Sequence, residues 1–429
     1  MAKAYTSPQP HANFRRKTLL HMIGQVIRPM RSPACLIALL LAAGAADAVS
    51  AQAVDVAPLA APDAFSTPGR DTGLPASLWR GASVATARTV LPLLATKPLT
   101  PAGQQLARRV LAAGAPGPQG AGSDPALLAV RAGALSATGD PKAAAALLAR
   151  GPGLDRSPEL ARAAAESALL AGQDAQACAT EEGLSAGRED VYWLRLRAYC
   201  QAIAGKTAQA QFTFELAQNQ ARDTVFGRLM AAKLSGGEPG AASLRNGLDF
   251  ALSRSLGLNL EAAKPAPAVA AALAGGDPVP PTWDLSLLDP AVAGLAGAMT
   301  AGQPLPAGGV SALIAAAAEA DAKSRPKVQG QALLIAALAD DLSAQDRGAL
   351  AAFAIPEGKA PAARNLALED AGRRKLMGET ALLALWTLAE AGPAGPSIAD
   401  RARIVHALAL AGLVTEARAL AVEGLLAAK

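Results

Sequence analysis

Three stretches of the chain share one format: GALSATGDPKAAAALLARG (residues 133–151), SALLAGQDAQACATEEG (residues 167–183) and YCQAIAGKTAQAQFTFELA (residues 199–217). In each, an alanine-rich apolar run is followed by a glycine, one or two polar residues and a second alanine-rich run. The glycines are Gly139, Gly172 and Gly205, and both spacings are 33 residues. Alanine and leucine favour helices, and glycine adopts the left-handed backbone that ends a helix. Each stretch therefore predicts two helices joined by a tight turn.

A fourth and looser copy follows, LMAAKLSGGEPGAASLRNGL (residues 229–248). It places Gly236 and Gly237 31 and 32 residues beyond Gly205, and we assign the fourth turn to Gly237. A single helical hairpin cannot bury its apolar face, whereas stacked hairpins share one continuous core. The equal spacing therefore predicts an all-α fold in which helical hairpins stack into an array.

This region, about residues 126–255, resembles the tetratricopeptide-repeat superfamily, whose units are helical hairpins with a period near 34 residues. The residues that match its pattern are Trp193, Leu196 and Cys200 in a first helix, and Ala208 or Ala210 with Phe214 in a second helix. The consensus glycine after the leucine is replaced by Arg197, and the closing proline is missing. The resemblance implies a superhelical solenoid that binds a protein or peptide on its concave face. It leaves open whether the array is curved or closes on itself.

Composition divides the whole chain, including the repeats, into five predicted segments. These are an upstream extension with a signal peptide (1–53), a disordered Ala/Pro linker (54–76), the repeats (77–256), a Pro-rich connector with a short helix (257–290) and C-terminal helical hairpins (291–429). The last pair of helices repeats the hairpin format around Gly412, in IVHALALAGLVTEARALAVEGLLA. We therefore expect the C-terminal half to continue or close the same superhelix.

The first segment has the features of an export leader. Met30 begins a short basic stretch, an apolar run follows from Cys35 to about Ala46, and an A-x-A cleavage signal ends at Ala53. We predict a true start at Met30, or alternatively at Met22, and cleavage after Ala53, with Ala46-Asp47-Ala48 as a second candidate signal. An uncleaved membrane anchor is the alternative, but an apolar run of about a dozen residues is short for a bilayer. We expect an exported, periplasmic bacterial protein with no further membrane segment.

The net charge of +5 is confined to the leader. Residues 1–53 hold six basic side chains and one acidic one, whereas residues 54–429 hold 34 of each sign. Nucleic-acid binding needs a basic face, so we expect no such partner. Gly205-Lys206-Thr207 matches the end of a phosphate-binding loop, but Cys200 stands where that motif has its first glycine and no strand precedes it. We therefore expect no nucleotide and no other cofactor.

Two cysteines remain after the predicted cleavage, Cys178 and Cys200. They lie six residues after Gly172 and five before Gly205, on helices predicted to be antiparallel, so they fall level with one another. Helix axes about 8–10 Å apart bring level cysteines within disulfide distance. We predict a Cys178–Cys200 disulfide, which agrees with an oxidising compartment. Two buried free thiols are the alternative.

Six of the fourteen aromatic side chains fall within residues 192–226. Tyr192 and Trp193, next to Arg195 and Arg197, are candidates for a partner-binding groove, because aromatic and arginine side chains are common interface anchors. The alternative is that the aromatic residues form the core of the third hairpin and the arginines a solvated helix face.

No motif in the sequence marks a catalytic or metal site. His406 is the single histidine after residue 53, and its place in the amphipathic run RARIVHALALAG indicates a packing or surface residue. A histidine-based zinc site would lack a second histidine, and a serine–histidine–aspartate triad would have to centre on this one. We expect a non-enzymatic protein without catalytic, cofactor-binding or metal-binding residues.

These features together predict an exported helical-repeat protein that binds a protein or peptide partner. A role as a scaffold for the assembly of the envelope or of a surface structure would suit such a protein. The alternative is a peptidoglycan-associated accessory protein, similar to the superhelical domain of lytic transglycosylases without their catalytic domain.

Overall fold

A computed structural model describes residues 63–149, 151, 153–274, 280–306, 308–339 and 341–428. These residues belong to one compact unit, Ala60–Lys429. The predicted signal peptide, its cleavage after Ala53 and the first part of the predicted linker lie outside the described residues.

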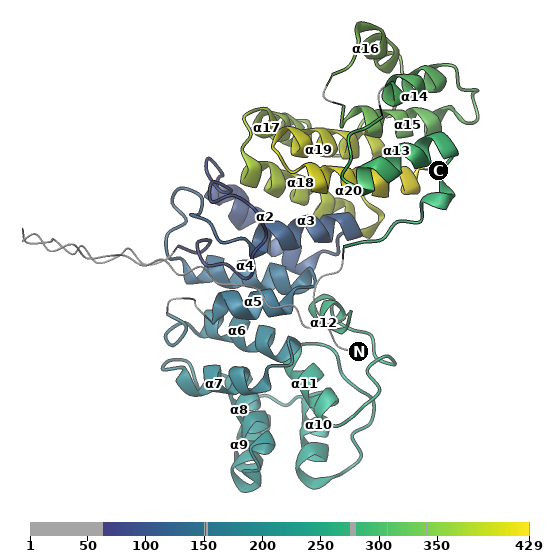
Figure 1. The fold of residues 1–429 in the computed structure, drawn as a ribbon. Helices are drawn as coiled ribbons and strands as arrows, with labels where there is room; N and C mark the ends of the chain where they lie inside the picture. The colour runs from purple at the N-terminus through teal and green to yellow at the C-terminus, as the bar shows by residue number, and fades with distance from the viewer. Residues whose placement is uncertain are drawn as a thin grey trace, which may run out of the picture. The chain divides into compact units, whose positions relative to one another are not determined.

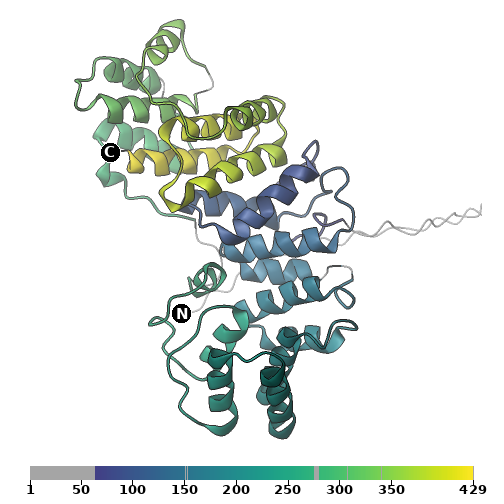
Figure 2. The same cartoon turned by 180° about the vertical axis from the view of Figure 1, so that it is seen from behind.

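The described residues form α-helices without any β-strand, as the alanine- and leucine-rich composition predicts. The helices of the first half are α2 (Val84–Thr96), α3 (Pro101–Ala112), α4 (Pro125–Ala137), α5 (Pro141–Leu148), α6 (Pro158–Leu170), α7 (Asp174–Gly183), α8 (Val191–Ile203), α9 (Thr207–Gln220), α10 (Thr224–Ser235), α11 (Gly247–Ser255) and α12 (Pro267–Leu273). Those of the second half are η2 (Leu285–Leu287), α13 (Pro290–Thr300), α14 (Gly309–Ala318), α15 (Arg325–Ala336), α16 (Ala344–Ala351), α17 (Ala362–Arg373), α18 (Met377–Ala391), η3 (Gly392–Ala394), α19 (Ile398–Leu410) and α20 (Val414–Ala427). Figures 1 and 2 show them from opposite sides.

The three stretches quoted above form helical hairpins with one shared turn. α4 and α5 meet at Gly139, α6 and α7 at Gly172, and α8 and α9 at Gly205, with φ values of 100°, 75° and 72°. Each glycine N–H donates to the carbonyl three residues earlier, as in Gly205 to Ala202 (3.1 Å), and the next N–H donates to the carbonyl five residues earlier. This is the Schellman pattern, which satisfies the last carbonyls of the first helix.

The fourth copy does not repeat this turn. Gly236, not Gly237, takes the left-handed conformation (φ 71°) and ends α10. The next helix begins only at Gly247, where the Asn246 side chain accepts a hydrogen bond from the Asp249 N–H (2.8 Å). The prediction that Gly237 forms the turn is therefore wrong. The proline and glycine that follow it keep the chain out of a helix until the asparagine cap is reached.

Two hairpins near the C-terminus use the same turn as the first three. α19 and α20 meet at Gly412 (φ 92°). α17 and α18 meet at Lys375, whose φ of 56° is the only positive value of a non-glycine residue within the described ranges. The Lys375 N–H donates to Gly372 O (2.9 Å) and the Leu376 N–H donates to Ala371 O (2.9 Å). A lysine thus occupies the position that glycine has in the other hairpins.

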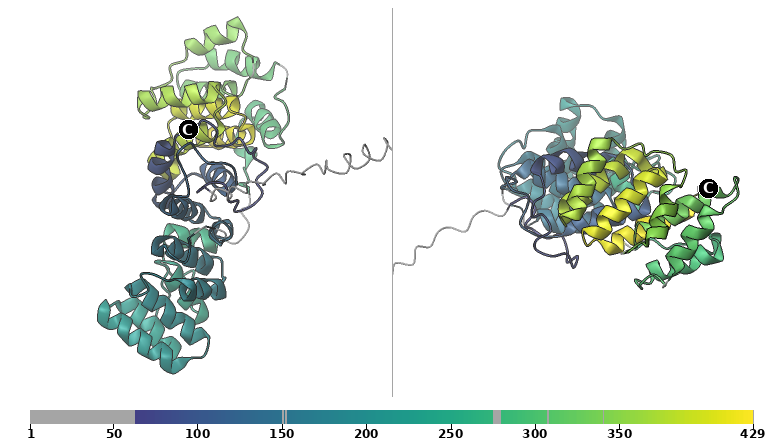
Figure 3. Two further views of the ribbon diagram at one scale, coloured as in Figure 1. Left: turned by 90° about the vertical axis from the view of Figure 1, so that its left-hand side faces the viewer. Right: turned by 90° about the horizontal axis from the view of Figure 1, so that it is seen from above.

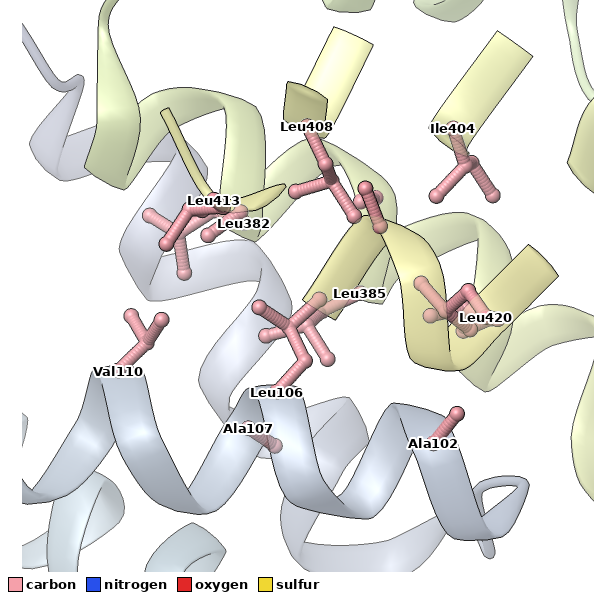
Figure 4. Packing of buried hydrophobic residues seen from close by; sticks show 14 of the residues in the cluster. Ala102, Leu106, Ala107, Val110, Leu382, Leu385, Ile404, Leu408, Leu413 and Leu420 are labelled. Atoms are coloured by element: carbon pink, nitrogen blue, oxygen red, sulfur yellow. The ribbon is translucent and has the colours of Figure 1, made fainter. Parts of the chain in front are cut away.

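The C-terminal hairpins pack against the first helices of the chain. α18 lies beside α2 and α3, and α20 lies beside α3, whereas α9 lies at the far end of the first three hairpins (Figures 1 and 3). Figure 4 shows Leu106 of α3 meeting Leu385 of α18, with Leu408 of α19 above them. The C-terminal half therefore adjoins α2 and α3, which precede the first hairpin, and does not follow α9 at the end of the third hairpin.

One hydrophobic core spans both halves of the chain. It joins buried residues of α2 to α5 with buried residues of the C-terminal helices, while a second core joins α6 to α11. The boundary predicted between residues 77–256 and 291–429 therefore does not coincide with a division of the core. The connector between them is a link within one packed unit.

Two glutamates of the C-terminal half cap helices of the N-terminal half. Glu379 on α18 accepts a hydrogen bond from the Ser83 N–H (2.8 Å) at the start of α2. Glu423 on α20 accepts one from the Ala102 N–H (2.9 Å) at the start of α3 and also pairs with Arg401 (2.7 Å). A carboxylate at a helix N-terminus satisfies free N–H groups and favours the helix dipole. Each of these hydrogen bonds thus caps a helix of the N-terminal half with a side chain of the C-terminal half.

Residues 63–76, predicted as the end of a disordered linker, pack against the core. Phe65 is fully buried, and its ring centroid lies 4.7 Å from that of Trp79. The buried guanidinium of Arg131 on α4 donates to three backbone carbonyls, one of which is Ala64 O (2.9 Å). The prediction of disorder is therefore wrong for this segment, because its Ala/Pro composition conceals one aromatic anchor and a distant arginine that holds its backbone.

The helices α10 to α12 cover one side of the hairpins. α11 lies against α6, and α12, inside the predicted connector, lies against α4, α5 and α6 (Figure 1). The Gly247 N–H donates to the Glu166 carboxylate on α6 (2.6 Å), and Arg254 on α11 pairs with Asp174 (2.6 Å). A Cβ atom on Gly247 would meet the Glu166 carboxylate at 2.8 Å and the Glu166 carbonyl oxygen at 3.0 Å, so glycine favours this close approach. The chain itself therefore covers α4 and α6 on this side.

Candidate functional site

The aromatic residues singled out in the sequence lie in the core. Tyr192 and Trp193 stand in the first turn of α8, which the Asp190 side chain caps, and they are 8% and 2% exposed. They pack with buried residues of α6, α10 and α11. These two side chains cannot line an exposed groove, and the alternative interpretation, the core of the third hairpin, applies to them.

A buried polar cluster lies beside Tyr192. The Arg162 guanidinium lies over the Tyr192 ring, 4.5 Å from its centroid, and Glu166 holds the Gly247 N–H. Burial raises the pKa of the Glu166 carboxyl and of the Tyr192 hydroxyl. Such shifts are common in active sites, but here the carboxylate is engaged in fixing α11 to α6. The second carboxylate oxygen of Glu166 and the Tyr192 hydroxyl are buried without a hydrogen-bond partner among the described residues, so the contact between the two helices accounts for only part of the cluster.

The two arginines of the predicted binding site are engaged within the chain. Arg195 lies 3.5 Å from the Asp223 carboxylate. Arg197 pairs with the buried Glu181 carboxylate (2.7 Å), which Arg188 also contacts (3.1 Å). A partner that used either predicted arginine would have to replace these contacts.

A disulfide joins Cys178 on α7 to Cys200 on α8, with Cα atoms 5.6 Å apart. It agrees with the pairing predicted from the turn spacing, so the alternative of two free thiols does not apply. The bond lines a cavity of about 480 Å³ whose wall also includes Arg188, Arg197 and Lys206. The disulfide therefore fixes two successive hairpins to one another beside a polar cavity.

A largely apolar groove lies over α19, and we call it the α19 groove. Its volume is about 530 Å³, within the range of pockets that hold a ligand or an anchoring side chain. Its floor is a stripe of one helix: Ala399, Ala402, Arg403, His406, Ala407 and Leu410. These residues recur at helical spacing on one face, so the floor extends about 17 Å along the helix axis.

Three other helices supply the walls of the α19 groove. The wall residues are Leu333, Ala336, Ala337 and Ala339 at α15, Leu342, Leu350, Phe353, Ile355, Pro356 and Glu357 at α16 and its flanking segments, and Glu369 and Arg373 on α17. The large apolar side chains of the walls face a floor in which three of the six residues are alanine. Small side chains on the floor thus leave the space, and larger ones at the walls supply apolar contact area.

Charged side chains stand at the rim of the α19 groove. Arg403 lies between Asp400 (3.5 Å) and Glu369 (3.9 Å), and Arg373 lies 3.5 Å from Asp370. Arg373 and Arg403 are substantially exposed, and long ion pairs at the surface contribute little to stability. These groups can therefore exchange their present partners for charges on a ligand at small cost.

His406, interpreted from the sequence as a packing or surface residue, is exposed on the groove floor. Its Nδ1 lies 3.1 Å from Ala337 O. A carbonyl oxygen only accepts, so Nδ1 carries the proton, and Nε2 of the neutral ring is left as an acceptor. The sequence did not reveal the groove because its walls come from three separate segments. The stripe of small residues around His406 is the one local signal.

The α19 groove offers apolar surface and a rim of both charges, which suits non-covalent binding. Within the described ranges, no cluster of three histidine, cysteine, aspartate or glutamate side chains is arranged to hold a metal ion. None of the described helices combines the length and apolar character needed to cross a membrane.

Comparisons of the chain with protein-family models, with curated protein sequences and with solved structures find no match. Its function has to be inferred from its own geometry.

Proposed function

We propose that this chain is an exported helical-repeat protein, built as a tetratricopeptide-like solenoid, that binds a protein partner in the α19 groove. The groove carries the proposal, because it joins an apolar floor about 17 Å long to apolar walls and a charged rim. The shared turn at Gly139, Gly172 and Gly205 supports the repeat assignment. The leader pattern together with the disulfide supports export.

The dimensions of the groove suit an amphipathic helix of the partner. A helix of about three turns matches the length of the floor, and it would rest on His406 and Leu410, the exposed floor residues. An apolar stripe on the incoming helix would contact Leu333, Leu350 and Phe353. Arg373 and Arg403 at the rim would fix its direction through charges on its flank.

A different binding surface, formed by the first helices of the hairpins such as α4 and α6, is less favourable for a partner than the α19 groove. α11 and α12 already cover α4 and α6 there. A peptide would have to displace the Glu166–Gly247 and Asp174–Arg254 contacts before it could bind. Binding in the α19 groove would use residues that are already exposed, His406 and Leu410 on its floor and Pro356 and Glu357 on its wall.

Site-specific photo-crosslinking in the source cells tests the proposal. A photo-reactive phenylalanine analogue at Leu410, exposed on the groove floor, should form a discrete adduct with one partner protein. His406→Trp, which fills the groove from an exposed position, should abolish that adduct. The same analogue at Leu287, which is exposed outside the groove, serves as the matched control and should not form it.

Two results would count against the proposal. An adduct at Leu410 that persists in the His406→Trp variant would show that the groove is not the contact. Retention of the protein on isolated sacculi without any protein adduct would favour the peptidoglycan-associated alternative.

A further inference from the structure

The Cys178–Cys200 disulfide lies in the wall of a cavity, at the edge of the second core. The cavity has a volume of about 480 Å³, enough for a small organic molecule. Cys178 is partly exposed, and Cys200 is 9% exposed. Ala175 and Ala179 on α7 and Ala204 after α8 line the same cavity, and alanines cover the sulfur atoms less than longer side chains would. A small molecule that enters the cavity can therefore reach the bond.

Cationic side chains outnumber anionic ones in the wall of this cavity. The cations are Arg188, Arg197 and Lys206, and the anions are Glu181 and Glu182. Glu181 is buried between the two arginines, at 3.1 and 2.7 Å, whereas Lys206 is exposed. α9 begins directly after Lys206 without a side-chain cap, so the positive end of its dipole adds to this charge. The cavity therefore attracts anions more than cations.

Positive charge beside a disulfide favours its exchange with thiols. Both the attacking group and the leaving group of this reaction are thiolates, and nearby cations stabilise a thiolate. Arg197 stands one helical turn before Cys200 on α8, so Cys200 is placed to leave as the thiolate. Cys178 is the more exposed of the two cysteines and is therefore the one open to attack.

Groups other than the disulfide also hold α7 beside α8. Of the ten residues of α7, Ala177 and Glu181 are buried. The Glu181 carboxylate pairs with Arg197 on α8 and with Arg188 in the segment before it. With the disulfide open, these ion pairs still tether α7 to α8. The two cysteines thus stay within reach of one another, and the bond can close again.

We propose that this disulfide is an exchange site for a small anionic thiol, independent of the α19 groove and of the function proposed for it. The thiolate of the incoming molecule attacks Cys178 Sγ and forms a new S–S bond with it. The Cys178–Cys200 bond breaks, and Cys200 Sγ takes the electron pair as a thiolate. The product is a mixed disulfide on Cys178, without net oxidation or reduction. Attack of the Cys200 thiolate on Cys178 reverses the step and expels the small thiolate.

Three thiols with one carbon skeleton test the proposal: 2-mercaptoethanesulfonate, 2-mercaptoethanol and cysteamine, which are anionic, neutral and cationic. Each reacts with the full chain in native buffer and in urea, in a Cys35→Ser background that removes the third cysteine. Dividing the native rate by the rate in urea removes the intrinsic reactivity of each thiol. This ratio should be at least about threefold larger for the sulfonate than for cysteamine, because the cavity attracts anions.

Variants and peptide mapping locate the reaction. Lys206→Glu should abolish the preference for the anionic thiol, because it reverses the exposed charge of the cavity wall. Lys264→Glu makes the same change of net charge at an exposed residue outside the cavity and should keep the preference. After an acid quench and alkylation, the mixed disulfide should map to Cys178 and the alkyl group to Cys200.

Three results would overturn the proposal. A native chain that resists all three thiols, while the chain in urea reacts, would show that the folded protein shields the bond. Equal ratios for the three thiols would show that the charge of the cavity does not select the thiol, as would reaction through global unfolding. A mixed disulfide on Cys200 would contradict the order of attack.

Discussion

At the scale of single residues, Lys375 tests how far the hairpin turn depends on backbone conformation. It holds φ 56° where the other hairpins have glycine. The left-handed conformation costs a non-glycine residue about 1–2 kcal/mol, and glycine adds about 0.5–1 kcal/mol of backbone entropy to the unfolded state. We therefore expect Lys375→Gly to raise the free energy of unfolding by about 0.5–1 kcal/mol, as measured by urea denaturation.

Gly205→Ala is the converse control for this prediction. A Cβ atom at Gly205 would meet no atom within 4 Å, so any loss comes from its φ of 72° alone. Its free energy of unfolding should fall by about 0.5–1 kcal/mol, which is the strain less the entropy that alanine removes from the unfolded state. If both variants change stability in the same direction, the conformation of the turn residue is not what limits these hairpins.

Arg131 is the residue on which the packing of residues 63–76 depends. Burial lowers the pKa of its guanidinium to about 9, and three carbonyl acceptors offset the cost of the buried charge. Arg131→Met leaves those carbonyls without donors, so the free energy of unfolding should fall by about 3 kcal/mol. Trypsin cleavage after Arg70 should also become faster.

Arg156→Met is the matched control, since Arg156 is exposed and makes only a long pair to Asp155 (3.8 Å). It should change stability by less than about 0.5 kcal/mol. Equal stability of the two variants would mean that residues 63–76 pack without help from Arg131.

At the scale of helices, the sequence was a good guide where the signal is local. Alanine and leucine runs ended by glycine predicted the hairpins around Gly139, Gly172, Gly205 and Gly412, and each is observed. Local signals failed at Gly237, where a proline and a second glycine postpone the next helix. They also failed for residues 63–76, because the contacts that hold this segment come from α4.

Reduction of the disulfide between α7 and α8 should change both the mass and the stability of the protein. Its cysteines are 22 residues apart, and a loop of this length corresponds to roughly 3 kcal/mol in chain-entropy models. We expect the intact mass to rise by two hydrogens on reduction and the free energy of unfolding to fall by about 3 kcal/mol. Mass spectrometry and urea denaturation with and without dithiothreitol measure these two effects.

The Cys178→Ser/Cys200→Ser variant supplies the control, because its stability should not respond to dithiothreitol. Alkylation of both wild-type thiols in denaturant without reductant would contradict the disulfide.

At the scale of the whole molecule, the sequence could not predict which helices meet. The contact of α20 with α3 joins residues that are more than 300 positions apart, and no periodic pattern encodes such a pairing. The α19 groove was hidden for the same reason, since its floor near His406 and its walls near Phe353 and Arg373 belong to different segments. What local patterns do encode is the apolar face of each helix, and several stacking orders would bury the same faces.

Glu423 tests whether the two halves are coupled in folding. Glu423→Gln keeps an acceptor for the Ala102 N–H but leaves the buried Arg401 guanidinium without its carboxylate. Breaking a buried pair on one side costs about 3–5 kcal/mol, so we expect a loss of that size in urea denaturation. Arg401→Met in the same chain should recover part of it, because the unpaired charge is then removed as well.

Native-state hydrogen exchange then locates the coupling that Glu423 provides. Because α3 and α20 share one core and this cap, Glu423→Gln should raise exchange in α2, α3 and α18 to α20 together. Exchange in α8 and α9 should respond less, since they belong to the second core. Faster exchange in α20 alone would mean that the C-terminal half opens independently, and the core that spans both halves would then not be a cooperative unit.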